Sequence, residues 1–143
     1  MGKVMTKVKL TNDHEAQLAA AGSLDPVRVR SVTVDALVDT GATMLTIPAE
    51  ACRALGLPHR GTRRVRYADG RIREVPWVGG ILLEILGRQM TCDALVESER
   101  TVPLIGQIPL EGLDLVVNPK TGDLMPDPAS PDAPLLDLLA ASL

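Results

Sequence analysis

The chain contains no phenylalanine, and its only aromatic side chains are Tyr67 and Trp77. Its 143 residues are nevertheless 45% apolar, so the core must be built from valine, leucine, isoleucine and alanine. A chain of this length makes one domain that can bury such a core. The valine and isoleucine content favours strands, since branched side chains fit a pleated surface.

The net charge is also small, and the chain has few cysteines and no long apolar run. A charge of −3 argues against a general nucleic-acid binder. No apolar run approaches the length of a membrane span, and the first residues lead into a strand pattern, not a signal-peptide apolar block. Cys52 and Cys92 form no metal or redox spacing, and His14 and His59 are isolated. We therefore expect a cytoplasmic protein with reduced thiols, no metal, no cofactor and no membrane partner.

Short strand-like runs separated by turn signals predict an all-β barrel or sandwich with short helices. A capped helix is expected at 12–21 before Gly22, and a second at 48–55 before Gly56. The strands are expected at 4–10, 27–34 continuing into 36–38, 63–67, 71–78, 81–86, 90–96, 113–117 and 123–125.

The most informative segment is Asp39-Thr40-Gly41-Ala42, which directly follows the apolar run Ala36-Leu37-Val38. Hydrolysis of a peptide bond by carboxyl groups needs two of them sharing one proton, one as base towards water and one as acid towards the carbonyl. The Asp-Thr-Gly triplet occurs once, so one chain supplies one carboxylate. Two chains related by a two-fold axis would place residue 39 opposite residue 39. The sequence therefore predicts half an active site, completed in a homodimer.

Together with Pro103-Leu104-Ile105-Gly106 and the hairpin between them, this segment resembles the retropepsin-like (clan AA) single-domain aspartic proteases, most closely their small bacterial branch. The similarity covers about residues 27 to 125. It implies a closed all-β barrel that forms half of a two-fold symmetric enzyme. Asp39 would be the catalytic carboxylate, and the Thr40 hydroxyl would tie the two active-site loops together. The Gly41 N–H would support the carboxylate, and Ala42 would line the substrate cleft.

The resemblance also assigns roles to two further segments. Leu104, Ile105 and Gly106 would cross behind the active-site loop, where glycine lets two backbones approach closely. The hairpin with Tyr67 and the tip Ala68-Asp69-Gly70 occupies the position of the family's flap, which folds over the peptide and excludes water. Without that position it would be interpreted as an ordinary surface hairpin.

The chain departs from the viral members at an ionic network that stabilises their dimers. Those proteins have an arginine after the second motif and an aspartate shortly after the triplet. Here Gln107 holds the arginine place, and Thr43 or Met44 the aspartate region. The dimer must therefore be held differently.

Six arginines crowd the predicted flap, and Val65 and Tyr67 alternate with them. This pattern favours a solvated face of a hairpin. The alternative is an electropositive rim that selects acidic peptide segments. Nucleic-acid binding fits less well, since Tyr67 is the only aromatic residue among the arginines. The six are Arg60, Arg63, Arg64, Arg66, Arg71 and Arg73.

We predict an aspartic endopeptidase that acts as a homodimer on peptides or proteins, through a water held between two Asp39 carboxylates. The alternative is a non-catalytic dimerisation or interaction module that retains the fold. The domain is expected over residues 1–125, its first 26 residues including a strand and the helical insert. A Pro-rich tail follows at 126–143, either flexible, docked on the dimer partner or clipped by the enzyme itself.

Overall fold

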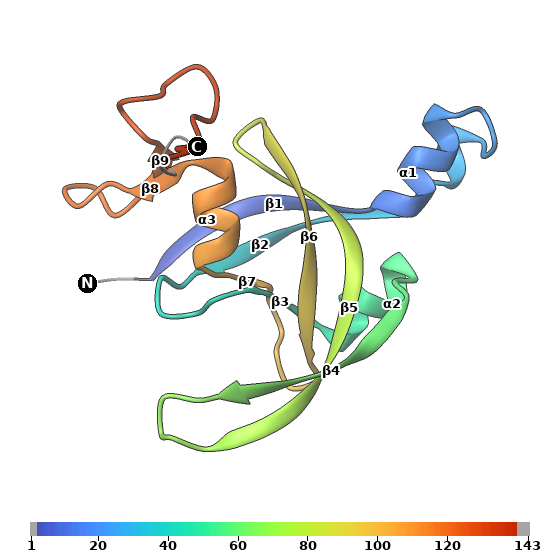
Figure 1. The fold of residues 1–143 in the computed structure, drawn as a ribbon, viewed down its shortest axis with the longest axis horizontal. Helices are drawn as coiled ribbons and strands as arrows, with labels where there is room; N and C mark the ends of the chain where they lie inside the picture. Colours follow the sequence, from blue (N-terminus) through green and yellow to red (C-terminus); the bar gives the residue numbers. More distant parts are fainter. Residues whose placement is uncertain (1–2, 140–143) are drawn as a thin grey trace.

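A computed structural model describes residues 3–139, and Figure 1 shows its elements. Strands dominate, and the helices are short. None of the described helices is long and apolar enough to cross a bilayer. In chain order the elements are β1 (Val4–Asn12), α1 (Asp13–Ala20), the 3₁₀ turn η1 (Pro26–Arg28), β2 (Ser31–Val38), β3 (Leu45–Pro48), α2 (Ala49–Leu55), β4 (His59–Arg66), β5 (Ile72–Ile85), β6 (Arg88–Glu97), β7 (Leu104–Ile105), α3 (Gln107–Leu113), β8 (Leu115–Val117) and β9 (Leu124–Pro126).

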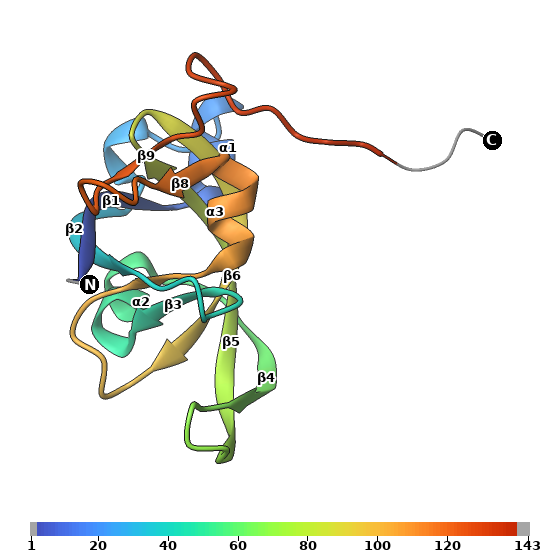
Figure 2. The ribbon, with the colours of Figure 1, turned by 90° about the vertical axis from the view of Figure 1, so that its left-hand side faces the viewer.

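Six strands close into a barrel. Their order is β1-β2-β7-β3-β6-β5, and β5 pairs with β1 to complete the ring. Two pairings in the ring are parallel, β2 with β7 and β3 with β6. Among the described residues, strand β4 pairs only with β5 and extends with it as a hairpin away from the ring (Figure 2). The predicted all-β closed barrel with short helices is confirmed.

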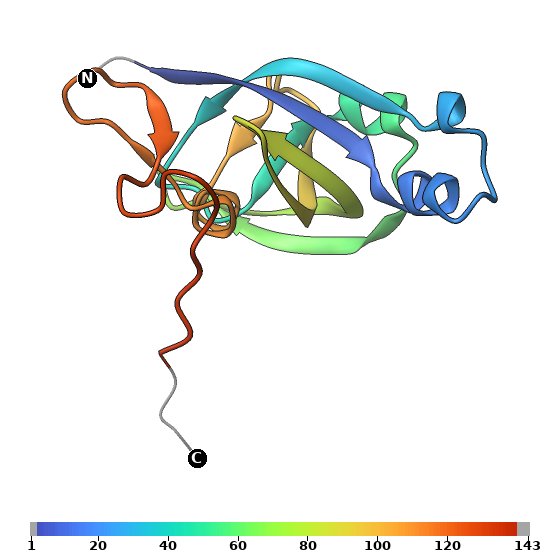
Figure 3. The same ribbon diagram turned by 90° about the horizontal axis from the view of Figure 1, so that it is seen from above.

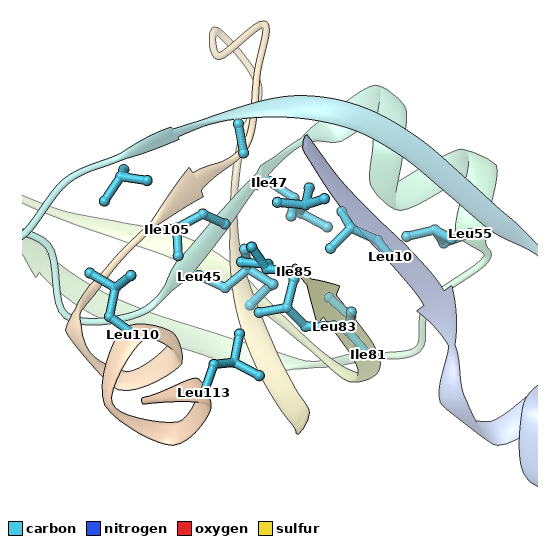
Figure 4. Packing of buried hydrophobic residues seen from close by; sticks show 14 of the residues in the cluster. Leu10, Leu45, Ile47, Leu55, Ile81, Leu83, Ile85, Ile105, Leu110 and Leu113 are labelled. Carbon is cyan, nitrogen blue, oxygen red and sulfur yellow. The ribbon is translucent and has the colours of Figure 1, made fainter. Parts of the chain in front are cut away.

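Aliphatic side chains alone fill the barrel, as the lack of phenylalanine requires. Alternate residues of β1, β5 and β6 point inward, and helix α3 closes one side of the barrel with Leu110 and Leu113 (Figure 4). Among the described side chains, those that are fully buried include Leu10, Leu45, Ile47, Leu55, Ile81, Leu83, Ile85 and Ile105.

Strand β5 is longer than the sequence pattern indicates. The two strands expected at 71–78 and 81–86 form one strand of 14 residues, bent where the register with β6 shifts between Val78 and Ile81. Gly80 has φ +64°, and a side chain at Gly79 would collide with Arg60 and Asp93. The glycine pair therefore forms a bulge that lets one strand serve both the barrel and the hairpin.

The strand expected from residue 27 begins only at Ser31. The Asp25 side chain accepts a hydrogen bond from the Val27 N–H at 3.0 Å, and Pro26 opens the 3₁₀ turn. This cap turns residues 26–28 away from the strand direction, so that part of the prediction was wrong.

Helix α3 was not predicted, and the strand expected at 113–117 begins at Leu115. Pro109 and Gly112 lie within this short helix and obscure it in the sequence. Pro109 is in the first turn, where its missing N–H costs nothing. Packing of its apolar residues against the barrel outweighs the weak local propensity.

Both predicted helices are present, with the caps that the sequence indicates. The Asn12 side chain accepts a hydrogen bond from the Glu15 N–H at 3.1 Å at the start of α1. Gly56 adopts the left-handed conformation after α2. The insert containing α1 is tied down by Arg30, whose guanidinium binds Glu15 and lowers the pKa of that carboxyl to about 2.

The segment after β9 folds back on the barrel before it leaves the molecule. Buried Arg88 donates hydrogen bonds to the carbonyls of Leu113, Asp114 and Ser130. The Asp114 carboxylate accepts from the Ser130 hydroxyl, which lowers the pKa of Asp114. Residues 131–139 are exposed, and the Leu135 N–H donates to Asp114 Oδ2 at 3.0 Å before the chain runs away from the body (Figure 3). The final residues of the predicted tail, 140–143, lie outside the described part.

Candidate active site

The segment with Asp39 lies at the carboxyl end of β2. Ala36 and Val38 are buried in the barrel, and β2 lies between β1 and β7. The Leu37 N–H donates to the Pro103 carbonyl and the Asp39 N–H to the Ile105 carbonyl, both at 2.9 Å. The predicted second motif therefore fixes the point where the strand ends and the loop begins.

Within the loop, the backbone of Gly41 supports the Asp39 side chain. Its N–H donates to Asp39 Oδ1 at 2.9 Å, and a Cβ at Gly41 would lie 3.2 Å from that oxygen. The Ala42 N–H donates to the Asp39 carbonyl and closes the turn. Asp39 is partly exposed, and Thr40 and Gly41 are exposed. No lysine or arginine in residues 3–139 lies within 4.0 Å of the Asp39 carboxylate.

Gly106 lies directly behind this loop. A Cβ there would lie 2.6 Å from the Met44 carbonyl oxygen, 2.7 Å from that of Ala42 and 2.8 Å from the Thr43 carbonyl carbon. These contacts leave room only for glycine, so the two backbones approach as closely as the sequence indicates.

The first turn of α3 holds the loop through its free N–H groups. Gln107 and Ile108 donate to the carbonyls of Ala42 and Thr43, at 2.8 and 2.9 Å. The Gln107 side-chain amide also donates to the Thr40 carbonyl at 2.7 Å. The sequence marked Gln107 only as a departure from the viral pattern. In the structure it is bonded to the loop at both its backbone and its side chain.

The predicted flap is a hairpin with a three-residue tip. The Tyr67 N–H donates to the Arg71 carbonyl and the Gly70 N–H to the Tyr67 carbonyl, both at 2.9 Å. Gly70 has φ +87°, as the last position of such a tip requires. Asp69 lies between Ala68 and Gly70 and binds the Arg71 side chain at 2.7 Å.

A side-chain contact connects the hairpin to the segment after β6. The Tyr67 hydroxyl donates to Glu97 Oε2 at 3.2 Å, and Arg100 binds the other carboxylate oxygen at 3.2 Å. Burial, followed by the nearby charge of Glu97, raises the pKa of the Tyr67 hydroxyl. No sequence signal indicated Glu97 or Arg100, because only the fold brings residues 30 positions apart together.

A cavity of about 200 Å³ lies beside this contact, between the hairpin stem and residues 97–99. Ala49, Val75 and Val96 supply its apolar part, and Tyr67 and Arg73 lie among its polar lining. Asp39 is not among the residues that line it. In the single chain, the Asp39 loop and the segment 103–106 are therefore in direct contact. The hairpin lines a different cavity, which Asp39 does not reach.

The comparison with known families agrees with this geometry. Residues 26–81, which include β2, the Asp39 loop and the hairpin tip, match a family model described as aspartyl protease. This match and the closed barrel support a retropepsin-like aspartic protease domain. No curated protein matches the chain. The family indicates protease activity for this retropepsin-like domain at a general level.

Within the described residues 3–139, no group of three histidine, cysteine, aspartate or glutamate side chains is arranged to hold a metal ion. Cys52 and Cys92 are free thiols. Burial raises the pKa of both, and that of Cys92 reaches about 12.

Proposed function

We propose that this protein is an aspartic endopeptidase that is active as a homodimer. The observation that supports the proposal best is the state of Asp39. Its carboxylate stands at the surface, held by one backbone N–H, with no cation within 4.0 Å among the described residues. An acidic side chain presented in this way is available to a second copy across a two-fold axis.

In the dimer, the two Asp39 carboxyl groups would share one proton, since like charges at such short range cannot both ionise. The ionised one takes a proton from a water molecule, whose oxygen attacks the peptide carbonyl carbon. The protonated one gives its proton to the carbonyl oxygen. The tetrahedral intermediate then collapses, the C–N bond breaks, and the nitrogen leaves with a proton. The reaction requires no metal, no cofactor and no covalent intermediate.

The neighbouring residues would support this chemistry. The Gly41 N–H holds the carboxylate, Thr40 ties the two loops together, and Ala42 lines the cleft. Leu104, Ile105 and Gly106 brace the loop from behind, through the backbone contacts described above. The hairpin tip, formed by Tyr67 and Ala68-Asp69-Gly70, closes over the bound peptide and excludes water.

The dimer would be held without the ionic network of the viral enzymes. Gln107 binds the loop of its own chain, so the loop is fixed before the partner arrives. We further propose that the catalytic domain spans residues 1–125, that the tail begins at residue 126, and that the protein acts on peptides or proteins in the cytoplasm.

Cleavage of a proteome-derived peptide library tests the proposal. Wild type and Asp39→Asn are compared from acidic to neutral pH. Asp35→Asn is the matched control, because Asp35 is an exposed aspartate four residues earlier that pairs only with Lys7, at 3.9 Å. We expect cuts from wild type and Asp35→Asn, and none from Asp39→Asn.

Equal cutting by the Asp39→Asn protein would overturn the assignment. If a confirmed wild-type dimer makes no cuts, the result favours the alternative, an interaction module that retains the fold.

A further inference from the structure

The arginine-rich hairpin has features that cleavage chemistry does not use. Residues 59–78 contain six arginines and two carboxylates, a net charge of +4 in a chain of −3. Half of the eight residues of β4 are arginines, namely Arg60, Arg63, Arg64 and Arg66. This positive charge lies on the β4–β5 hairpin. Figure 2 shows that the hairpin projects from the barrel.

Strand β4 also has an unpaired edge. Closure of the barrel gives every strand of the ring two neighbours, whereas β4 ends the sheet and pairs only with β5 among the described residues. The backbone groups along its outer side are therefore available to an added strand.

The charges along this edge are largely free. Within residues 3–139, no carboxylate oxygen lies within 4.0 Å of the guanidinium nitrogens of Arg63, Arg64 or Arg66. Arg60 does have a partner, Asp93 at 3.7 Å, although both side chains remain partly exposed. Glu74 lies opposite Arg64 in the strand register without forming an ion pair. Guanidinium groups without partners bind carboxylates well, because two parallel N–H groups match two oxygens.

We propose that the outer edge of β4 binds an extended, acidic peptide segment of the substrate that lies outside the cleavage cleft. Arg64 and Arg66 are two residues apart and share one face of the strand. An added strand has the same repeat, so carboxylates at alternate positions, as in Glu-x-Glu, would face this arginine pair. The role in substrate selection rests on the proposed protease function, whereas the binding itself does not.

Nucleic acid fits this surface less well, although it is also anionic. Single-stranded binding relies on aromatic side chains on which bases stack. The Trp77 ring is covered by Arg63, whose guanidinium carbon lies 3.7 Å from the ring centroid. The Tyr67 hydroxyl is bonded to Glu97, and Arg71 lies near its ring. Neither aromatic ring is therefore free, and the chain contains no other.

The test measures binding to the inactive Asp39→Asn protein, so failure of the protease proposal would leave it intact. Fluorescent peptides with Glu-x-Glu repeats, and matched peptides with glutamine in place of glutamate, are titrated by fluorescence anisotropy. We expect binding of the glutamate peptide alone, weakened as salt rises from about 50 mM to about 300 mM.

Added to the inactive protein, Arg64→Glu with Arg66→Glu should weaken binding about tenfold or more. The double variant Arg64→Gln with Arg66→Gln should also weaken binding of the glutamate peptide. This neutral variant keeps the test valid if charge reversal disturbs folding. The control pair is Arg28→Glu with Arg53→Glu, because both arginines are exposed and lie outside the hairpin. This pair should leave binding unchanged.

Absence of binding at low salt, or equal binding by the Arg64/Arg66 variants, would overturn the proposal. Tighter binding of a single-stranded oligonucleotide than of the glutamate peptide would also do so. A glutamate peptide methylated at every backbone nitrogen cannot donate to the strand edge and should bind more weakly. Equal binding of that peptide would refute the added strand.

Discussion

At the scale of single residues, the backbone of the Asp39 loop depends on a position where no side chain fits, that of Gly106. Gly106 meets three backbone atoms of residues 42–44, none of which can move alone. Gly112 differs, because a Cβ there would meet only the Met90 side chain. Methionine is flexible and can give way. A substitution at Gly106 therefore tests a backbone constraint, whereas a substitution at Gly112 tests ordinary side-chain packing.

We predict that Gly106→Ala lowers the free energy of unfolding by about 2 to 3 kcal/mol, because the loop and β7 must separate. Gly112→Ala should stay within about 1 kcal/mol of wild type, since alanine favours the helix. Urea denaturation of both variants measures the difference. Equal free energies of unfolding for the two variants would show that the close approach of the Asp39 loop and β7 is not rigid.

A second prediction concerns the thiols. Burial raises the pKa of Cys92 to about 12, so the folded protein keeps this thiol protonated where an unfolded chain ionises it. Its contribution to stability should be complete below pH 9, the ordinary value for a thiol, and should be lost as pH rises towards about 12. At pH 8 a thiol reagent should label Cys52 faster than Cys92, because burial raises the pKa of Cys92 further. Cys52→Ser should therefore remove the faster phase of labelling, and an unchanged fast phase in that variant would contradict this prediction.

At the scale of elements, the Tyr67 hydroxyl fastens the hairpin tip to the segment after β6. Tyr67→Phe removes this hydrogen bond and should free the tip with little effect on overall stability. We predict that the amides of Tyr67 and Gly70 exchange about two to five times faster in the variant. Hydrogen exchange followed by NMR measures this, with Thr62→Ala as the control in the same hairpin. Unchanged exchange would show that the tip is held by its backbone alone.

The elements also show what the sequence could and could not predict. Alternating apolar residues and glycine turns were sufficient for β1, β6 and the hairpin tip, since those signals are local. Helix α3 was missed because its stability comes from burial against a barrel that a local pattern does not contain. The length of β5 was misjudged because a glycine pair can mean either a turn or a bulge.

In the candidate active site too, only contacts within a short segment could be predicted from the sequence. The support of the Asp39 carboxylate by the Gly41 N–H could be predicted, because one short segment holds both groups. The contacts of Gln107 with Thr40, and of Tyr67 with Glu97, depend on segments that meet only after folding. Their residue types give no local signal, so they could not have been found from the sequence.

At the scale of the whole molecule, one chain presents one carboxylate that we propose to be catalytic, that of Asp39. The barrel, the Asp39 loop and the hairpin all belong to a single copy, and the aspartyl protease match at residues 26–81 includes the loop and the hairpin tip. The chemistry requires two carboxyl groups, which only a second copy can supply in this account. In the proposed mechanism, only a pair of chains is therefore active.

Mixing wild type with Asp39→Asn tests this claim most directly. The two proteins are mixed in equal amounts at constant total concentration, left to exchange subunits, and assayed on a peptide that wild type cleaves. If each active site needs Asp39 from both copies, only pairs of wild-type chains are active, and activity should fall to about one quarter of the wild-type value. A fall to only about one half, as expected if each chain acts alone, or to about three quarters, as expected if mixed pairs are fully active, would show that one Asp39 is enough and would contradict the proposal, provided that labelled chains confirm subunit exchange.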